Sequence, residues 1–473
     1  MTDPTTQPPD PTPGQPRRPS REEVLKNAMA GLTTSFVVVS LGAAFGVMSG
    51  RGAFAGMISA AIIGIVVSLL GGTRIAVSGP TGPMTAVTAA MVAFSYDQGA
   101  KLFPGLPPEQ FVSYVLIATS ALLLLFAVLR LSKLIHYIPQ VVISGFMNGI
   151  AVLIWLDVAN QVLGAGGKKP LEGSMALNLG LLAVTFLMAW KAGGPLKALT
   201  GRWSSFFPAT LVAILLITGV SQGLGLQVER TQLQGIRGLA DLVEMARRFV
   251  PTELPSSAML WAIAPYAFTL AILNFLDTLM TALVMDKITG DTSGLNRELF
   301  GQGVATLAVV PFGGIPGAQA TIRSVLLYKE GATLRWAGTA AGLLALVQVL
   351  VFQDAIGWIP KAVFMGILVK VGVDVFDWGP LLMWFARLRG AKPGDVSVSH
   401  VEMLIIAGTT TLTVLWDLNV AVASFTALFY LLRKGFKVPM LDLHPASEAL
   451  PVPEAGAEAT PVVEAVGSTP VQG

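Results

Sequence analysis

The chain has 473 residues, of which 53% are hydrophobic and 12% charged, with a mean hydropathy of +0.67. Soluble domains carry about 25% charged residues, so this composition predicts a protein that is largely embedded in a bilayer. The absence of cysteine excludes disulfides and thiolate metal sites, and the three histidines lack metal-ligand spacing, so we expect no cofactor. We interpret the net charge of +3 as a signal of membrane topology rather than of nucleic-acid binding.

Both ends of the chain have the composition of disordered tails. Residues 1–27 are rich in Pro and polar residues, carry Arg17, Arg18, Arg21 and Lys26, and lack the apolar core of a signal peptide. Residues 436–473 are rich in Pro, Ala and Glu. We expect two disordered tails on the cytoplasmic side.

Between the tails, apolar segments predict an all-α polytopic membrane protein with fourteen transmembrane spans. Two of the segments, those starting at residues 80 and 316, are shorter than the roughly 20 residues of a full span and are predicted to be half-helices. The predicted spans are 28–49, 53–71, 80–95, 111–130, 139–163, 174–191, 205–223, 259–285, 297–312, 316–329, 334–353, 358–376, 400–416 and 418–434.

Charge distribution and internal similarity predict how these spans are organised. Lys and Arg are concentrated in the tails and in the loops on the side of the N-terminus, which places both termini in the cytoplasm. A long external linker, 224–258, separates spans one to seven (28–223) from spans eight to fourteen (259–435). Because seven is odd and similar motifs recur in the same order, the two parts are predicted to form an inverted repeat.

Each half contains a short Gly/Pro break at the matching place, in its third span. The first is Ser78-Gly-Pro-Thr-Gly-Pro-Met84 and the second is Gly313-Gly-Ile-Pro-Gly-Ala-Gln319. Broken backbone at membrane depth survives only where protein or a water-filled cavity satisfies its polar groups, and paired breaks point to a transporter's substrate site. We therefore predict extended segments that lead into two half-helices whose N-termini meet and bind an anion.

Polar side chains accompany both breaks. In the first half-helix, predicted to begin at Pro80, Thr81, Thr85 and Thr88 recur on one face. The second, predicted to begin near Pro316, carries Gln319, Thr321 and Arg323. Arg323 is interpreted as an anion-binding residue, with structural pairing to a carboxylate or a carbonyl as the alternative.

The eighth span supplies a second ionisable group. Its residues Asn274, Asp277, Thr278 and Thr281 lie on one face of an otherwise apolar helix. A carboxylate well inside a span needs a partner to ionise, so Asp277 is predicted to carry a proton or to ligate a small cation. The alternative is a hydrogen-bond network between helices.

Three stretches resemble a known family. They are Thr289-Gly-Asp-Thr-Ser-Gly-Leu-Asn-Arg-Glu-Leu-Phe-Gly-Gln-Gly303, Phe312-Gly-Gly-Ile-Pro-Gly317 and Val77-Ser-Gly-Pro-Thr-Gly-Pro83. Together they are similar to the SulP anion transporters, the prokaryotic side of solute carrier family 26. The resemblance implies a core domain (spans one to four and eight to eleven) and a gate domain (five to seven and twelve to fourteen).

The resemblance also implies roles for individual residues. The anion would bind between the N-termini of the third and tenth helices, next to Arg323. Asp277 would be the coupling residue, with Thr281 and Thr321 as further ligands if the cation is Na⁺. The expected substrate-binding residues are Ser78, Gly79, Thr81, Gly82, Phe45, Gln319, Ala320, Thr321 and Arg323.

The sequence departs from the family pattern in two places. Many members have Pro-Gln-x-x-x-Tyr in the first helix, where this chain has Ser40-Leu-Gly-Ala-Ala-Phe45, so a side-chain amide contact to the substrate is missing. Members usually end in a cytoplasmic STAS domain of roughly 100 residues, whereas the short tail after Lys437 cannot build a packed domain.

Within the family, the chain most resembles prokaryotic proton-coupled members that carry C4-dicarboxylates, which implies proton-coupled symport of a dicarboxylate such as fumarate. We expect a bacterial inner-membrane protein that forms a homodimer. The alternatives are a sodium-coupled bicarbonate transporter and a sulfate or chloride transporter or channel of the same family. Nucleobase transporters fit less well, because they carry an acidic residue where Gln319 lies. An aspartyl protease would need a G-x-G-D pattern, which Asp374 lacks, so no enzyme activity is expected.

Overall fold

A computed structural model describes residues 19–137, 139–165, 170–191, 209–230, 239–389, 398–416 and 418–435. This part of the chain is mostly helical, which confirms the predicted helical membrane fold. Most of the two predicted tails, residues 1–18 and 436–473, lies outside the described residues.

The helices follow the predicted spans closely. Each of the fourteen apolar segments has a helix at its place, while the number that cross a membrane stays a prediction. These helices are α1 (Arg21–Met48), α2 (Ala53–Leu70), α3 (Gly82–Phe94), α5 (Pro108–Val128), α6 (Gln140–Leu163), α7 (Met175–Lys191), α9 (Ala209–Gly223), α11 (Ser257–Thr289), α12 (Leu295–Ala308), α13 (Thr321–Lys329), α14 (Trp336–Ile356), α15 (Lys361–Val375), α17 (His400–Leu415) and α18 (Leu418–Tyr430).

Shorter elements connect them. In the described part of the chain, three α-helices lie outside the predicted spans: the three-residue α4, α10 within the predicted linker, and α16 after α15. The connecting elements are β1 (Ser78–Gly79), η1 (Ser95–Gly99), α4 (Ala100–Leu102), η2 (Leu131–Tyr137), α10 (Leu239–Phe249), η4 (Val310–Phe312), β2 (Ala318–Gln319), α16 (Trp378–Leu388) and η5 (Leu431–Gly435).

Helix α1 begins at Arg21, earlier than the predicted boundary at residue 28. The Ser20 side chain accepts a hydrogen bond from the backbone N–H of Glu23 at 3.1 Å. Glu22 and Glu23 also place negative charge in the first turn, where it interacts favourably with the positive N-terminal end of the helix dipole. A polar capped turn therefore extends the apolar helix into the segment that composition alone assigned to the tail.

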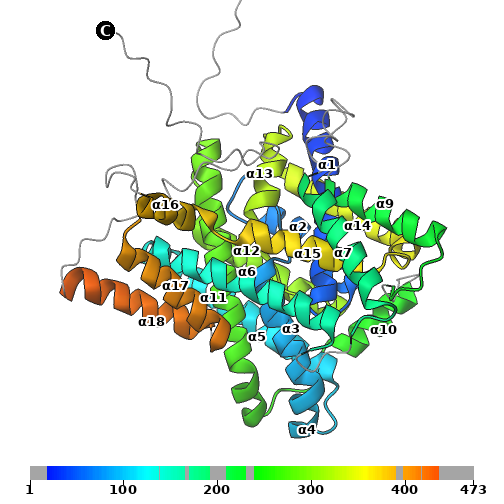
Figure 1. Ribbon diagram of the computed structural model, residues 1–473, viewed down its shortest axis with the longest axis horizontal. Coiled ribbons are helices and arrows are strands. Elements are labelled where there is room, and N and C mark those ends of the chain that lie inside the picture. Colours follow the sequence, from blue (N-terminus) through cyan, green and yellow to red (C-terminus); the bar gives the residue numbers. More distant parts are fainter. Residues whose placement is uncertain are drawn as a thin grey trace, which may run out of the picture.

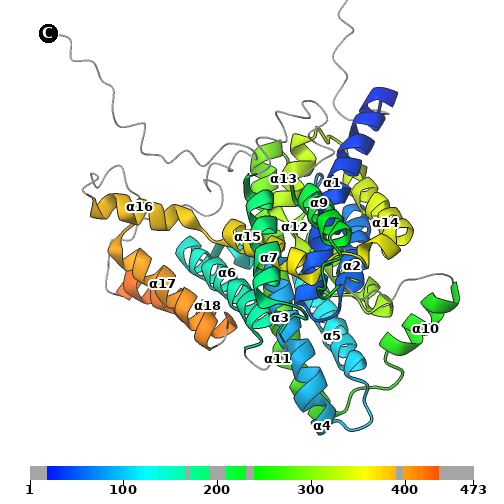
Figure 2. The same ribbon diagram turned by 45° about the vertical axis from the view of Figure 1, so that its right-hand side comes forward.

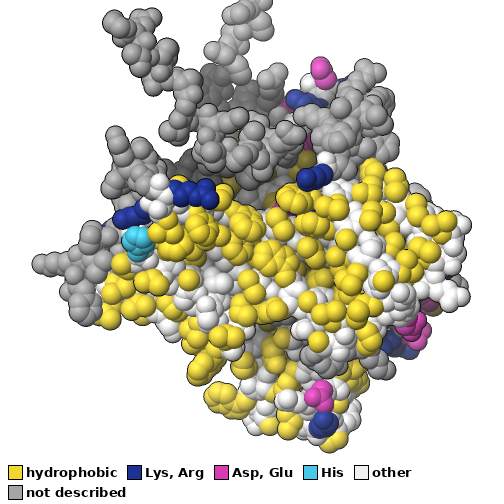
Figure 3. Space-filling model, viewed as in Figure 1, with side chains coloured by type: hydrophobic (Ala, Val, Ile, Leu, Met, Phe, Trp, Pro, Cys, Tyr) yellow, Lys and Arg dark blue, Asp and Glu magenta, His cyan; other side chains and the backbone are white. Residues whose placement is uncertain are grey.

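The surface has the character of a membrane protein. Five helices in the described part are long and apolar enough to cross a bilayer: Arg21–Met48, Ala53–Leu70, Pro108–Val128, Gln140–Leu163 and Ser257–Asp286. Figure 3 shows a broad apolar surface, with Lys and Arg side chains along its upper edge and further charged side chains near its lower end. This pattern fits a hydrocarbon-facing belt between two aqueous faces.

The helices pack in two groups. In the first, α2 packs against α1, α12 and α14, and α5 packs against α11 and α12. In the second, α6 packs against α15 and α17, and α7 packs against α9 and α15. The first group contains helices expected in the core domain and the second contains helices expected in the gate domain, a division that stays a prediction. The two groups meet where α1 and α3 contact α6, α9 and α15 (Figures 1 and 2).

Candidate functional site

The two Gly/Pro breaks lie side by side. β1 pairs with β2 in an antiparallel sheet with the register Ser78↔Gln319 and Gly79↔Ala318. The backbone at Gly317 fits this close approach because a Cβ there would lie 2.6 Å from the nitrogen of Pro80, closer than real Cβ atoms come. The predicted extended segments before both half-helices are therefore present, and each satisfies the backbone of the other.

Both half-helices start later than predicted. α3 begins at Gly82 rather than Pro80, and α13 begins at Thr321 rather than near Pro316, because the strand pairing holds the preceding residues extended. Neither N-cap residue, Thr81 or Ala320, makes a side-chain capping bond. The first N–H groups of each helix are thus left for another acceptor, as an anion site requires.

Side chains of both helix groups lie beside these N-termini. Thr321 is exposed, and Thr81 and Ala320 are partly buried. Gly82 is covered by the second group: a Cβ there would lie 2.8 Å from Cδ1 of Ile154 in α6 and 4.0 Å from Cγ1 of Val371 in α15.

Phe45 of α1 closes a further side of the space and is buried. Its Cε1 atom would lie 4.0 Å from the same Cβ on Gly82. Ile154 and Val371 belong to this site although they carried no signal in the sequence, since each is one apolar residue in an apolar helix.

Asp277 of α11 reaches the first half-helix. Its Oδ2 accepts a hydrogen bond from the Thr81 hydroxyl at 2.9 Å. In the described part of the chain, the hydrogen-bond partner of this carboxylate is therefore a hydroxyl group rather than a basic side chain. The predicted coupling residue is joined directly to Thr81, the N-cap residue of α3.

Asn274 and Thr278, on the same helix, serve the second break instead. The Asn274 amide donates to the carbonyl of Gly317 at 2.5 Å, and the Thr278 hydroxyl accepts from the backbone N–H of Gln319 at 3.2 Å. The alternative of a helix–helix hydrogen-bond network thus describes these two residues, while Asp277 faces the other break.

Thr281 and Thr321, for which the resemblance implies a role as further cation ligands, are in contact. Their hydroxyl oxygens are 2.7 Å apart, and Thr281 also donates to the carbonyl of Gln319 at 3.2 Å. Thr281 lies one turn after Asp277 on α11, so hydroxyl, carbonyl and carboxylate oxygens line this side of the space. Such oxygens are the ligands that coupling cations use in transporters with broken helices.

Arg323 is fully buried beside the first break. Its Nη2 donates to the carbonyl of Pro80 at 2.8 Å. Its Nη1 is buried without a hydrogen-bond partner among the described residues, 2.9 Å from the position that a Cβ on Gly79 would take. This is the structural alternative, pairing with a carbonyl, yet it also places a positive charge next to the start of α3.

The side chains of Ser78 and Gln319 point into the first helix group. Ser78 accepts a hydrogen bond from Nε2 of Gln302 at 3.0 Å, and Gln319 accepts one from the Thr73 hydroxyl at 3.4 Å. Both residues therefore border the site through their backbone. Gln302 was missed as a site residue, although it lies in the Gly-Gln-Gly that ends one of the stretches quoted for the resemblance.

The predicted hydroxyl face of α3 is divided. Thr85 and Thr88 are buried and donate to the carbonyls of Thr81 and Met84 within their own helix, both at 2.7 Å. Such bonds satisfy the hydroxyl locally. Of the three threonines, only Thr81 reaches another element.

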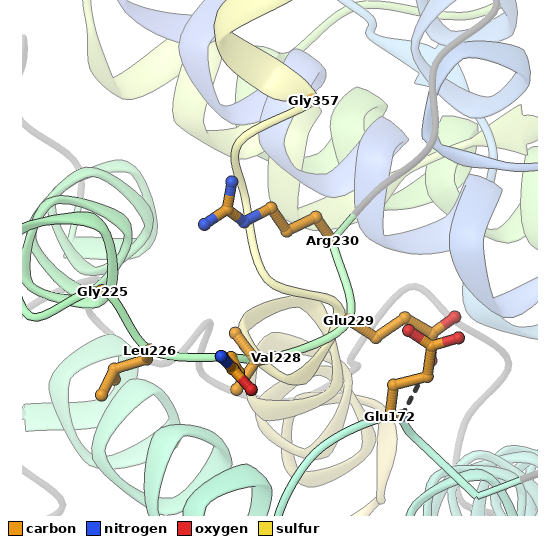
Figure 4. Close-up of a pocket in the computed structure, with 8 residues that line it drawn as sticks. Glu172, Gly225, Leu226, Val228, Glu229, Arg230 and Gly357 are labelled. Carbon is orange, nitrogen blue, oxygen red and sulfur yellow. Dashed lines mark hydrogen bonds between the residues drawn. The ribbon is translucent and has the colours of Figure 1, made fainter.

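A separate surface pocket of about 540 Å³ lies away from the breaks (Figure 4). It is formed by the segment after α9 and the turn before α15, and Arg230 points into it from the edge. Its lining residues are Glu172, Gly225, Leu226, Gln227, Val228, Glu229, Arg230 and Gly357, none of which is a predicted site residue.

Paired breaks in a helical membrane fold, with helix N-termini beside an acidic residue, define a membrane transporter for small anions rather than an enzyme. Residues 24–398 match the sulfate permease family, and the chain belongs to that family.

Relatives of several kinds are similar to the chain. The bicarbonate transporter BicA of Picosynechococcus sp. is 32% identical over 411 residues, which cover 83% of this chain and 67% of that protein. The chloride anion exchanger of Rattus norvegicus is 22% identical over 400 residues, which cover 78% of this chain and 50% of that protein. The chain thus spans about two thirds and one half of the lengths of these relatives.

Solved structures show the same fold. The transmembrane domain of a cyanobacterium bicarbonate transporter BicA superposes with a TM-score of 0.69 at 29% identity, covering 85% of this chain and 98% of that one. Murine solute carrier 26 family member A9, an anion transporter in its inward-facing state, gives a TM-score of 0.68 at 15% identity, covering 89% of this chain and 70% of that one.

Proposed function

We propose that the protein is a cation-coupled symporter of a small anion, with the anion held between the N-termini of α3 and α13 and the cation held at Asp277. The observation that carries this proposal is the 2.9 Å hydrogen bond from Thr81 to Asp277. It joins the carboxylate to the N-cap of an anion-binding helix, so that cation and anion would bind within one small space.

Coupling follows from charge. With Asp277 ionised and Arg323 protonated, the side-chain charges cancel and only the helix N-termini attract an anion. A cation bound at Asp277 adds one positive charge to the site. Each ion then raises the affinity for the other, by the same coupling free energy in both directions.

Bicarbonate with Na⁺ is the first candidate pair. The oxygens of Asp277, Thr281, Thr321 and Gln319 on one side of the site suit a small hard cation. Similarity to the bicarbonate transporter BicA, in sequence and in fold, supports bicarbonate as the anion.

A dicarboxylate such as fumarate, with a proton, is the second candidate pair. It is favoured by the hydroxyl partner of Asp277, because a carboxylate without a basic partner in a low-dielectric site readily takes up a proton. The chloride anion exchanger among the relatives and the match to the sulfate permease family make chloride and sulfate the remaining substrates to test.

The membrane arrangement proposed with this function has fourteen spans in two inverted halves. Both termini would lie in the cytoplasm of a bacterial cell, and the protein would form a homodimer in the inner membrane. The site borders both helix groups, since Ile154 and Val371 cover Gly82. Movement of the α3–α13 group against these two residues would expose the site alternately to the two sides.

The test is radiolabelled uptake into proteoliposomes. Bicarbonate, fumarate, sulfate and chloride are each offered under an inward Na⁺ gradient, an inward proton gradient, or neither. The Asp277→Asn variant is measured beside Asp97→Asn, which removes an exposed carboxylate that pairs with Lys101. We expect gradient-driven accumulation of one anion, a loss of about 5–150-fold in Asp277→Asn, and wild-type uptake in Asp97→Asn.

The outcomes separate the proposals. Accumulation of bicarbonate with Na⁺ alone supports the first pair, and accumulation of fumarate with protons alone supports the second. Uptake that ignores both gradients, or that survives in Asp277→Asn, contradicts cation coupling at Asp277 and leaves a passive or exchange mechanism.

A further inference from the structure

Helix α16 (Trp378–Leu388) is short and amphipathic, and it was not among the predicted spans. Its large apolar residues Trp378, Leu382 and Phe385 recur at helical spacing on one face. They are 42%, 61% and 46% exposed, whereas Pro380 on the opposite face is buried. The helix therefore turns its apolar stripe away from the protein.

Polar contacts fix the orientation of α16 at its start. Asp377, the residue before the helix, donates its backbone N–H to Oδ1 of Asn148 at 2.7 Å, and its carboxylate accepts a hydrogen bond from the Ser144 hydroxyl. Asn148 and Ser144 both belong to α6. Burial raises the pKa of the Asp377 carboxyl, an effect that the Ser144 hydroxyl partly offsets.

The other end of α16 is fixed as well. Nη1 of Arg387 donates to the carbonyl of Val398 at 3.0 Å, and Nε1 of Trp384 donates to Nδ1 of His400 at 3.0 Å. Held at both ends, the helix cannot turn its exposed stripe inward without breaking these bonds.

The direction of α16 differs from that of the long helices. In both Figure 1 and Figure 2 it lies across the direction of α1 and α11, on the same side of the molecule as the start of α1. In Figure 3 it coincides with the upper edge of the apolar belt, where Lys and Arg side chains gather. This level, at the border between the apolar surface and the basic side chains, fits a helix that lies along the surface of the proposed membrane.

We propose that α16 is a lipid-binding helix, which inserts Trp378, Leu382 and Phe385 into the headgroup–acyl boundary of the bilayer while the exposed Arg389 contacts lipid phosphates. An in-plane helix with a tryptophan-containing apolar face and a basic end has the composition of interfacial membrane helices. Arg389 continues the stripe one turn beyond Phe385, so charge and apolar surface meet the same bilayer surface.

Lipid fits this face better than a second copy of the chain. The stripe is continuous with the apolar belt that the proposed bilayer covers, and basic residues border it on its aqueous side. The anchor would hold α15 and α17, and with them Val371 over the site, at a fixed depth in the membrane. This step rests on the membrane arrangement proposed above and is independent of which anion is carried.

The absence of cysteine makes a direct test possible. Single cysteines replacing Leu382 or Phe385 are spin-labelled, the chain is reconstituted in phosphatidylcholine vesicles, and collision with oxygen and with a water-soluble nickel chelate is measured. Glu22→Cys, in the exposed first turn of α1, is the aqueous control. Val347→Cys, 55% exposed in the middle of α14, is the control for the bilayer interior.

We expect the labels at 382 and 385 to collide more with oxygen and less with nickel than the label at 22, at a depth shallower than that of the label at 347. Accessibility to nickel equal to that at 22 overturns the proposal, because the face is then in water. Low collision with both reagents, with a dipolar distance between labels of two chains, also overturns it by making the face a dimer contact. Each labelled variant is first checked for the elution volume of the parent chain, so that misfolded protein is excluded.

Discussion

The segments that lead into the two breaks are held in the same manner by different chemistry. Before the first break, Oε2 of Glu298 accepts hydrogen bonds from the backbone N–H groups of Gly72 and Thr73 at 2.6 and 2.8 Å. Arg335 donates to the carbonyl of Gly71 at 2.5 Å. Glu298 and Arg335, which both belong to the second half of the chain, thus hold the backbone of this segment by hydrogen bonds.

Before the second break, the backbone is held by Arg51 of the first half of the chain, which packs against Phe249 of the linker. Nε and Nη2 of Arg51 donate to the carbonyl of Gly313 at 3.2 and 3.0 Å, and the ring of Phe249 lies 4.9 Å from the guanidinium carbon. Here one basic residue and an aromatic ring replace the acid–base pair.

Two serines make further hydrogen bonds between the two halves. The Ser59 hydroxyl in α2 accepts from the backbone N–H of Ile315 at 2.8 Å, and the Ser324 hydroxyl in α13 accepts from that of Val77 at 3.0 Å. Each break is therefore shaped by side chains of the other half. The comparison teaches that the segment before each half-helix is held by side chains from outside its own half, and that the two sets of contacts use different charged groups.

The largest loss of stability is expected from Gly317→Ala, a substitution that disturbs both breaks. In Gly317→Ala the new Cβ meets the backbone of Gly79 and Pro80. Because backbone cannot give way as a flexible side chain can, we expect a stability loss of about 1–3 kcal/mol or more, with loss of uptake. Gly219→Ala in α9, where a Cβ meets nothing within 4 Å, is the matched control. Equal melting temperatures of the two variants in detergent would show that the β1–β2 pairing contributes little.

Local sequence was sufficient for the breaks but not for their supports. The Gly and Pro spacing predicted two half-helices with meeting N-termini, and the Ser78↔Gln319 register confirms that the two breaks meet. The helix starts were placed too early, because the strand pairing that delays them depends on residues 240 positions away, beyond the reach of helical periodicity.

The hydrogen-bond partners of individual side chains were harder still to predict. Arg323 was predicted to bind an anion, with pairing to a carboxylate or carbonyl as the alternative. Its Nη2 bonds the carbonyl of Pro80, anion binding stays a prediction, and the sequence shows no feature that separates these two uses of a buried arginine. Arg51 lies outside the predicted spans, and its partner Gly313 is in the other half. Long-range polar contacts of this kind follow from how the helices pack, and composition and spacing do not encode them separately.

The acid–base grip on the first break is the next to test. Glu298→Ala leaves the partly buried N–H of Gly72 and the buried N–H of Thr73 without their acceptor, and a buried group of this kind costs about 1–3 kcal/mol. Glu298→Gln keeps one oxygen as an acceptor and is expected to lose less. Thermal unfolding in detergent should rank wild type above Gln and Gln above Ala. If the Ala variant is as stable as wild type, the carboxylate does not hold residues 72 and 73.

The grip on the second break should be weaker, because Arg51 lies in the loop between α1 and α2. Burial lowers the pKa of its guanidinium, mainly through desolvation, although arginine stays protonated at neutral pH. Arg51→Lys keeps the charge but loses the two-pronged bond to Gly313, so we expect a loss of about 1–2 kcal/mol. If Arg51→Lys melts at a lower temperature than Glu298→Ala, the contacts before the second break contribute more stability than those before the first, contrary to this prediction.

The smallest effect distinguishes the coupling ions. Thr81, at the first break, bonds Asp277, whereas Thr321, at the second, bonds Thr281. If Na⁺ lies among these oxygens, Thr81→Val and Thr321→Val should each raise the Na⁺ concentration for half-maximal uptake about fivefold, the equivalent of one hydrogen bond of about 1 kcal/mol. If a proton is carried on Asp277 instead, only Thr81→Val should change coupling, because Thr321 does not touch the carboxylate. Thr85→Val, whose hydroxyl bonds only its own helix, is the control for both. Unchanged cation dependence in all three variants would place the coupling ion away from both breaks.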